Sequence, residues 1–122
     1  MTTQAQTQSN AATHYEQWPE KAKNMHTQAP DLSTGFGTMF KKLMSEGALT
    51  VREKELIALG IAMALRCEPC IYSHVEKCLK SGATREQIIE LAGVVVTMQG
   101  GPAYVYTPKL LEALDALTPH NP

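Results

Sequence analysis

Two capping boxes constrain the fold of this chain more than any other feature of its sequence. Thr50 stands three residues before Glu53, and Thr84 stands three residues before Gln87. In such a pair, each side chain accepts a hydrogen bond from the backbone N–H group of the other residue, and this exchange marks the start of a helix. Long apolar segments follow both boxes, so we expect the middle of the chain to be helical.

The spacing of apolar side chains extends this expectation to most of the chain. Phe36, Met39 and Leu43 recur at intervals of three and four residues, which places them on one stripe of a helix. The three valines at 94–96 have strand propensity, but they lie inside a capped, periodic segment and are expected to be helical. The sequence therefore predicts an all-α bundle of five to six helices, at about 14–28, 30–47, 51–65, 69–80, 84–99 and 103–117.

The length and the polar ends of the chain indicate a single domain. With 122 residues the chain can bury one hydrophobic core, which we expect over residues 13–118. Residues 1–12 are rich in Gln and Thr and show no hydrophobic period, so they are expected to form a disordered tail. Residues 119–122 are expected to be a short C-terminal tail.

Charge and cysteine content indicate a cytoplasmic protein. The formal net charge of -1 argues against nucleic acid or a membrane surface as a partner. No apolar run reaches the ~18 residues of a membrane helix, and the first residues lack the basic and apolar segments of a secretory signal. Three cysteines are a poor basis for a secreted disulfide framework. In the cytoplasm, two nearby cysteines indicate redox or metal chemistry.

The central chemical feature is Cys67-Glu68-Pro69-Cys70, followed four residues later by His74. Pro69 suits the first turn of a helix, because its φ is fixed and it lacks an N–H group. Cys70 would then lie at a helix N-terminus, which favours the thiolate, with His74 one turn further along the same face. The imidazole could accept the thiol proton, and the second thiol could close a disulfide.

Two other interpretations of the cysteines remain open. Cys70 and Cys78 are eight residues apart, ~12 Å along a helix, so one zinc ion cannot bind both. A three-ligand site formed by Cys67, Cys70 and His74 is still conceivable, and so is a pair of inert core cysteines. We favour redox chemistry and assign no metal and no cofactor. Cys78, in the middle of a helix, is expected to be a buried structural thiol.

Glu55 is the other candidate, because an antiparallel hairpin of the helices at 51–65 and 69–80 would bring it close to His74. Its carboxylate could orient the imidazole in a proton relay. The alternative is that Glu55 is a solvated surface residue. The remaining histidines, at 14, 26 and 120, have no evident partner in the sequence and are expected to be surface residues.

These residues together resemble the signature of the AhpD-like, or carboxymuconolactone decarboxylase-like, family. The pattern is Glu55, eleven residues, Cys67-x-x-Cys70, three residues and His74. The flanking segments 49–59, 82–88 and 100–103 are similar as well, and the resemblance covers about residues 30–117.

The resemblance implies an AhpD-like all-helical subunit that assembles into trimers or hexamers. Family members with a Cys-x-x-Cys pair are thiol peroxidases and disulfide reductases. In that comparison Cys70 corresponds to the peroxidatic cysteine, Cys67 to the resolving cysteine, and His74 with Glu55 to the proton relay. The alkylhydroperoxidase members carry a second histidine where this chain has Pro69. Proximity to the helix N-terminus would favour Cys67 as the nucleophile, but we follow the resemblance.

The sequence therefore predicts a thiol peroxidase that reduces a hydroperoxide and is itself reduced by an external dithiol. The alternatives are a lyase of the decarboxylase type acting on a small lactone, and a non-catalytic redox-sensing or disulfide reductase module. The lactone decarboxylases of the family lack the cysteine pair, which argues against the lyase. The apolar helix at 56–65 and the valine run predict a homo-oligomer, because one small subunit cannot bury both.

Overall fold

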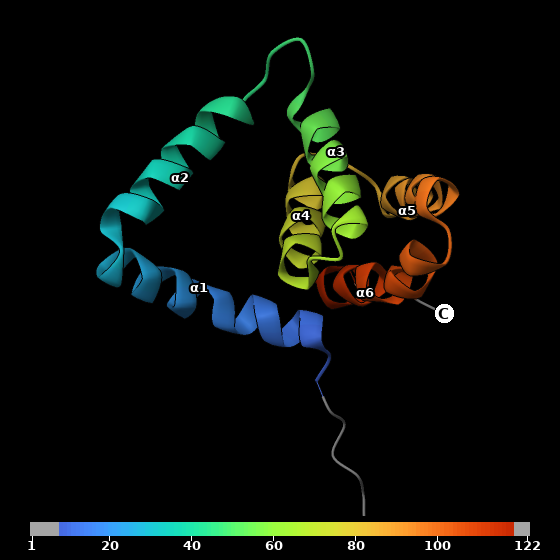
Figure 1. Ribbon diagram of the computed structural model, residues 1–122, viewed down its shortest axis with the longest axis horizontal. Helices are drawn as coiled ribbons and strands as arrows, with labels where there is room; N and C mark the ends of the chain where they lie inside the picture. Colours follow the sequence, from blue (N-terminus) through green and yellow to red (C-terminus); the bar gives the residue numbers. More distant parts are fainter. Residues whose placement is uncertain (1–7, 119–122) are drawn as a thin grey trace, which may run out of the picture.

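The computed structural model describes residues 8–118, which form six α-helices and contain no strand (Figure 1). This confirms the predicted all-α class and the number of helices. In chain order the helices are α1 (Asn10–Gln28), α2 (Pro30–Leu43), α3 (Val51–Ala64), α4 (Glu68–Lys80), α5 (Arg85–Gln99) and α6 (Gly101–Leu117). Within the described range, no helix is both long enough and apolar enough to cross a membrane.

Both predicted capping boxes are present. The N–H group of Thr50 donates to Glu53 Oε1 at 2.8 Å, and the N–H group of Glu53 donates to Thr50 Oγ1 at 3.1 Å. Thr84 and Gln87 make the same exchange at the start of α5, at 2.9 and 3.1 Å. Two strong helix starts are therefore fixed by local sequence, on either side of the segment that carries the cysteine pair.

α3 and α4 form an antiparallel hairpin at the centre of the molecule (Figure 1). α3 ends in a Schellman motif, in which the N–H group of Cys67 donates to the carbonyl of Ala62 at 3.0 Å. Arg66 occupies the left-handed position of this motif with a φ of 54°, where glycine is the usual residue. The tight turn places Cys67 directly before the first residue of α4 and sets which faces of the two helices meet.

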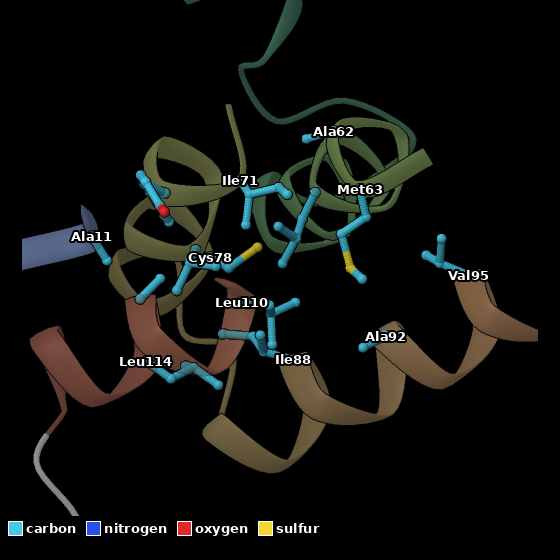
Figure 2. Packing of buried hydrophobic residues seen from close by; sticks show 14 of the residues in the cluster. Ala11, Ala62, Met63, Ile71, Cys78, Ile88, Ala92, Val95, Leu110 and Leu114 are labelled. Atoms are coloured by element: carbon cyan, nitrogen blue, oxygen red, sulfur yellow. The ribbon is translucent and has the colours of Figure 1, made fainter. Parts of the chain in front are cut away.

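The hydrophobic core lies between α3, α4, α5 and α6 and receives one small residue from α1 (Figure 2). Each fully buried aliphatic side chain contributes ~1.5–3 kcal/mol to folding relative to its exposure in water. The largest fully buried residues are Leu59 and Met63 of α3, Ile71, Val75 and Cys78 of α4, Ile88 of α5, and Leu110 and Leu114 of α6.

The prediction of a disordered tail over residues 1–12 is wrong at its C-terminal end. α1 begins at Asn10 and is capped by Ser9, whose Oγ accepts a hydrogen bond from the N–H group of Ala12 at 3.1 Å. Ala11 is fully buried. No hydrophobic period marked this start, because the buried side of the first turn consists of one alanine. Residues 1–7 and 119–122, which complete the two predicted tails, lie outside the described residues.

α2 differs from the other helices because none of its residues is buried. It follows α1 after Ala29 and extends beside the α3–α4 hairpin as an arm (Figure 1). The helix ends at Leu43 rather than at the predicted Gly47. Lys54 of α3 holds this end, since its ammonium group donates to the carbonyls of Leu43 and Ser45 at 2.9 and 2.6 Å.

We predict that Tyr15→Phe destabilises the protein by about 1 kcal/mol, because the Tyr15 hydroxyl donates to the carbonyl of Tyr72 and joins α1 to α4. The measurement is the free energy of unfolding in urea. Tyr104→Phe is the control, since the Tyr104 side chain is 69% exposed. Equal stability of the two variants would show that the hydrogen bond from Tyr15 to Tyr72 contributes nothing.

Candidate active site

The two cysteines of the central motif are joined by a disulfide. Cys67 is the N-cap residue of α4 and Cys70 lies in its first turn, with 5.2 Å between their Cα atoms. Pro69 occupies the first turn as predicted. The motif can therefore hold a dithiol/disulfide couple at a helix N-terminus. Within residues 8–118, no three or more His, Cys, Asp or Glu side chains are grouped as a metal site would require.

Glu55 and His74 meet between α3 and α4, as the hairpin geometry predicted. His74 Nδ1 lies 2.7 Å from Glu55 Oε1. The Glu55 side chain is 5% exposed and that of His74 16%, so Glu55 is not a solvated surface residue. The carboxylate fixes the ring orientation through Nδ1 and leaves Nε2 for another group. His74 follows Cys70 by one helical turn, so the two residues share one face of α4 and line the same pocket.

A pocket of about 270 Å³ lies beside this pair and reaches the disulfide at Cys70. α4 supplies its floor, α1 one wall and α2 the other. Aromatic rings and the disulfide make most of its surface apolar. The lining residues are Pro69, Cys70, Ser73, His74 and Lys77 of α4, His14 and Trp18 of α1, and Phe36 and Phe40 of α2.

Phe40 connects the α2 arm to the site. Its ring centroid lies 6.1 Å from that of His74, and the Lys77 ammonium lies 4.3 Å from the Phe40 centroid. Lys77 also donates to Ser73 Oγ at 3.2 Å. A second hollow of about 360 Å³ includes Phe40, Lys77 and Glu55 in its lining. The cation–π contact between Phe40 and Lys77 therefore borders both hollows.

Cys78 is a buried thiol, as predicted. It is fully buried in the core and carries no disulfide (Figure 2). Burial, with a smaller effect from the negative charge of Glu55, raises the pKa of the Cys78 thiol to about 12. Because the thiolate is the reactive form, Cys78 is chemically inert near neutral pH.

The expectation that His14 is a solvated surface residue is wrong. Its ring stacks on that of Trp18 with 5.5 Å between centroids and 22° between planes, and it lines the pocket. Burial, helped by the positive charge of Lys21 and opposed by Glu76, lowers the pKa of the His14 imidazole below 6.5. The only local signal was the spacing of four between His14 and Trp18, which puts both on one helical face.

Glu68 organises the start of α4, and no sequence pattern singled this residue out. Its carboxylate accepts hydrogen bonds from the Tyr72 hydroxyl, from Asn10 Nδ2 at 3.1 Å and from Lys109 Nζ at 3.2 Å. These contacts join α1, α4 and α6 directly after Cys67. The hydrogen bond from Tyr72, followed by those from Lys109 and Asn10, lowers the pKa of Glu68.

The helices that carry this site match a known protein family. Residues 30–118 match the Carboxymuconolactone decarboxylase family. The chain belongs to this family. The match starts at α2 and runs through α6, so it includes Glu55, both motif cysteines and His74, while His14 and the rest of α1 lie before it.

Relatives of this carboxymuconolactone decarboxylase family member support the same conclusion. An uncharacterised protein of Cupriavidus necator is 35% identical over 88 residues, which are 72% of this chain and 78% of that protein. The apo structure of a family protein from Legionella pneumophila has a TM-score of 0.79 and 33% identity, covering 86% of this chain and 94% of that one.

A further solved relative comes from Thermotoga maritima. It has a TM-score of 0.64 and 27% identity, and the similarity covers 70% of this chain and 88% of that one. It is a carboxymuconolactone decarboxylase family protein, and a part in the antioxidative response has been suggested for it.

We predict that Glu68→Gln lowers stability by about 1 kcal/mol at pH 7, because the variant loses charge-assisted hydrogen bonds. The pKa of Glu68 is lowered by folding, so this stabilisation is complete above the ordinary carboxyl pKa and is lost as the pH falls through the lowered value. The difference between wild type and variant should therefore shrink below about pH 4. Thermal unfolding at several pH values measures it, with exposed Glu90→Gln as the control.

Proposed function

We propose that this protein is a thiol-dependent peroxidase that reduces organic hydroperoxides through a Cys67–Cys70 dithiol/disulfide cycle. The observation that carries the proposal is the disulfide at the N-terminus of α4, one turn from a histidine held by a buried carboxylate. The part in the antioxidative response that has been suggested for the Thermotoga maritima relative supports the same class of chemistry.

In the proposed cycle the Cys70 thiolate attacks the terminal oxygen of the hydroperoxide and the O–O bond breaks. Cys70 becomes a sulfenic acid and the substrate leaves as an alcohol after gaining a proton. The Cys67 thiol condenses with the sulfenic acid, which releases water and forms the disulfide. An external dithiol then reduces the disulfide by exchange and is itself oxidised. His74 accepts the Cys70 proton through Nε2, and Glu55 keeps the ring in place through Nδ1.

The pocket favours organic hydroperoxides over hydrogen peroxide. Trp18, Phe36 and Phe40 offer apolar walls that an alkyl or aryl group can bury, whereas hydrogen peroxide has no such group. Lys77 is the cationic residue of this lining, and it adds a partner for a substrate that carries a carboxylate.

We predict that the reduced protein forms the Cys67–Cys70 disulfide on addition of one equivalent of cumene hydroperoxide. Cys70→Ser should lose more than about 99% of the rate, because the nucleophile is absent. Cys67→Ser should react once and stop at a Cys70 sulfenic acid. Mass spectrometry after dimedone and alkylation distinguishes these forms, and buried Cys78 serves as the internal control that stays unmodified.

Other results of these experiments would support an alternative assignment of the cysteines or an alternative function. A sulfenic acid on Cys67 in the Cys70→Ser variant would reverse the roles of the two cysteines. Thiols that stay reduced would reject the peroxidase, and lactone decarboxylation that survives loss of both thiols would establish a lyase. A disulfide that forms and exchanges with dithiols without peroxide turnover would indicate a redox sensor or disulfide reductase.

We also propose that the protein works as a homo-oligomer, a trimer or hexamer by analogy with its family. The support is the α2 arm, which has no buried residue and exposes an apolar stripe that includes Leu32 and Leu43, at 62% and 63%. A helix of this length without packing is marginal in water. On the hairpin side, Ile57 and Ile61 of α3 are exposed as well.

We predict a mass of three or six chains by light scattering, and a smaller mass for Leu32→Glu, which puts a charge on the stripe. Thr34→Glu, exposed on α2 but off the stripe, is the matched control and should keep the wild-type mass. A monomeric wild type would contradict the proposal.

A further inference from the structure

We propose that His14 of α1 is a second catalytic histidine, which protonates the oxygen that leaves when Cys70 attacks a hydroperoxide. The inference rests on the proposed peroxidase function and adds to it a residue outside the Glu55–Cys67–Cys70–His74 set. It starts from the position of His14 in the pocket that reaches Cys70 and His74.

His14 and His74 belong to different sides of that pocket, His14 to the wall formed by α1 and His74 to the floor formed by α4. His74 lies on α4 and follows Cys70 by one turn, whereas His14 reaches the pocket from α1. A hydroperoxide that presents its terminal oxygen to Cys70 therefore lies between two imidazoles. His74 is one turn from the nucleophile Cys70, and His14, on α1, would protonate the departing oxygen.

Three aromatic rings hold His14 in this position. Trp18 stacks on it at 5.5 Å, Tyr15 lies edge-on at 5.7 Å, and Tyr72 lies at 5.5 Å, between centroids. Within residues 8–118, no hydrogen bond occupies either ring nitrogen of His14. Glu55, in contrast, occupies Nδ1 of His74. The ring of His14 is thus fixed by apolar contacts while its nitrogens stay available to a ligand.

The reaction needs two proton transfers, and the two histidines divide them. His74 takes the proton of the Cys70 thiol, which generates the thiolate. The thiolate sulfur bonds to the terminal oxygen, the O–O electron pair goes to the alkoxide, and protonated His14 gives this alkoxide its proton. The products are the Cys70 sulfenic acid and the alcohol. His74 then loses its proton to solvent and His14 regains one, so the net reaction is thiol plus hydroperoxide to sulfenic acid plus alcohol.

The acidity of His14 suits this role. Burial lowers its pKa below 6.5, which makes its protonated form a stronger acid than a free imidazolium. The protonated fraction grows as the pH falls, so the advantage of His14 should be greatest at acid pH and fade as the pH rises through this lowered pKa. The titratable and charged groups around the pocket and beside His14 are Tyr15 and Lys21 on α1 and Glu68, Tyr72, His74, Glu76 and Lys77 on α4.

The test compares two oxidants that differ in their leaving group. Cumene hydroperoxide expels an alkoxide, which needs a proton, whereas perbenzoic acid expels a carboxylate, which does not. His14→Phe keeps a ring against Trp18 but removes the nitrogens. We expect it to slow oxidation of the reduced protein by cumene hydroperoxide about 100-fold at pH 6 and to change the rate with perbenzoic acid less than about threefold. Stopped-flow measurement of Cys70 oxidation gives both rates.

Controls separate this role from a structural one. His26→Phe changes an exposed histidine on the same helix and should leave both rates unchanged. His14→Gln, which retains polarity, is the second variant and should show the same selective loss. An equal loss with both oxidants in both His14 variants, or no loss at all, would overturn the assignment while the peroxidase stands. A wild type that reacts with neither oxidant would overturn the peroxidase and the His14 role with it.

Discussion

The tight reversal of the chain between α3 and α4 is the constraint on which the candidate site depends. Residues 65–67 make this turn, and Arg66 adopts a left-handed φ of 54° within a Schellman motif. Because helices are stiff and rise ~1.5 Å per residue, the turn determines which residues of the two helices face each other. It therefore sets both the Glu55–His74 contact and the position of Cys67 at the start of α4.

The Glu55–His74 pair is costly for a core of this size. Glu55 is the charged residue that lies buried in the described part of the chain, and its charge must be removed from water. Apolar residues of similar volume would fill the same space without that cost. A buried pair with this cost, beside an apolar pocket, supports the proton transfer that we propose for it.

Most of the helical framework could be predicted from residues that are neighbours in the sequence. The Thr50 and Thr84 capping boxes need only neighbouring residues, and the Glu55–His74 contact follows once a short turn joins two helices. The role of α1 could not be predicted in this way. Its buried face is small, with Ala11 as its one fully buried residue, so it leaves no apolar period in the sequence. Its contacts with α4, such as Asn10 with Glu68, join residues far apart in the chain and depend on tertiary packing.

The α2 arm both lines the pocket and exposes the apolar stripe that includes Leu32 and Leu43. Phe36 and Phe40 line the pocket, yet no residue of α2 is buried, so the helix lacks the packing that would hold these rings in place. The cation–π contact of Phe40 with Lys77 and the hydrogen bonds donated by Lys54 restrain only the C-terminal part of α2. If a second copy buries the stripe, it orders the wall of the pocket at the same time. Assembly and substrate binding would then be coupled, because the free energy that orders α2 is shared between them.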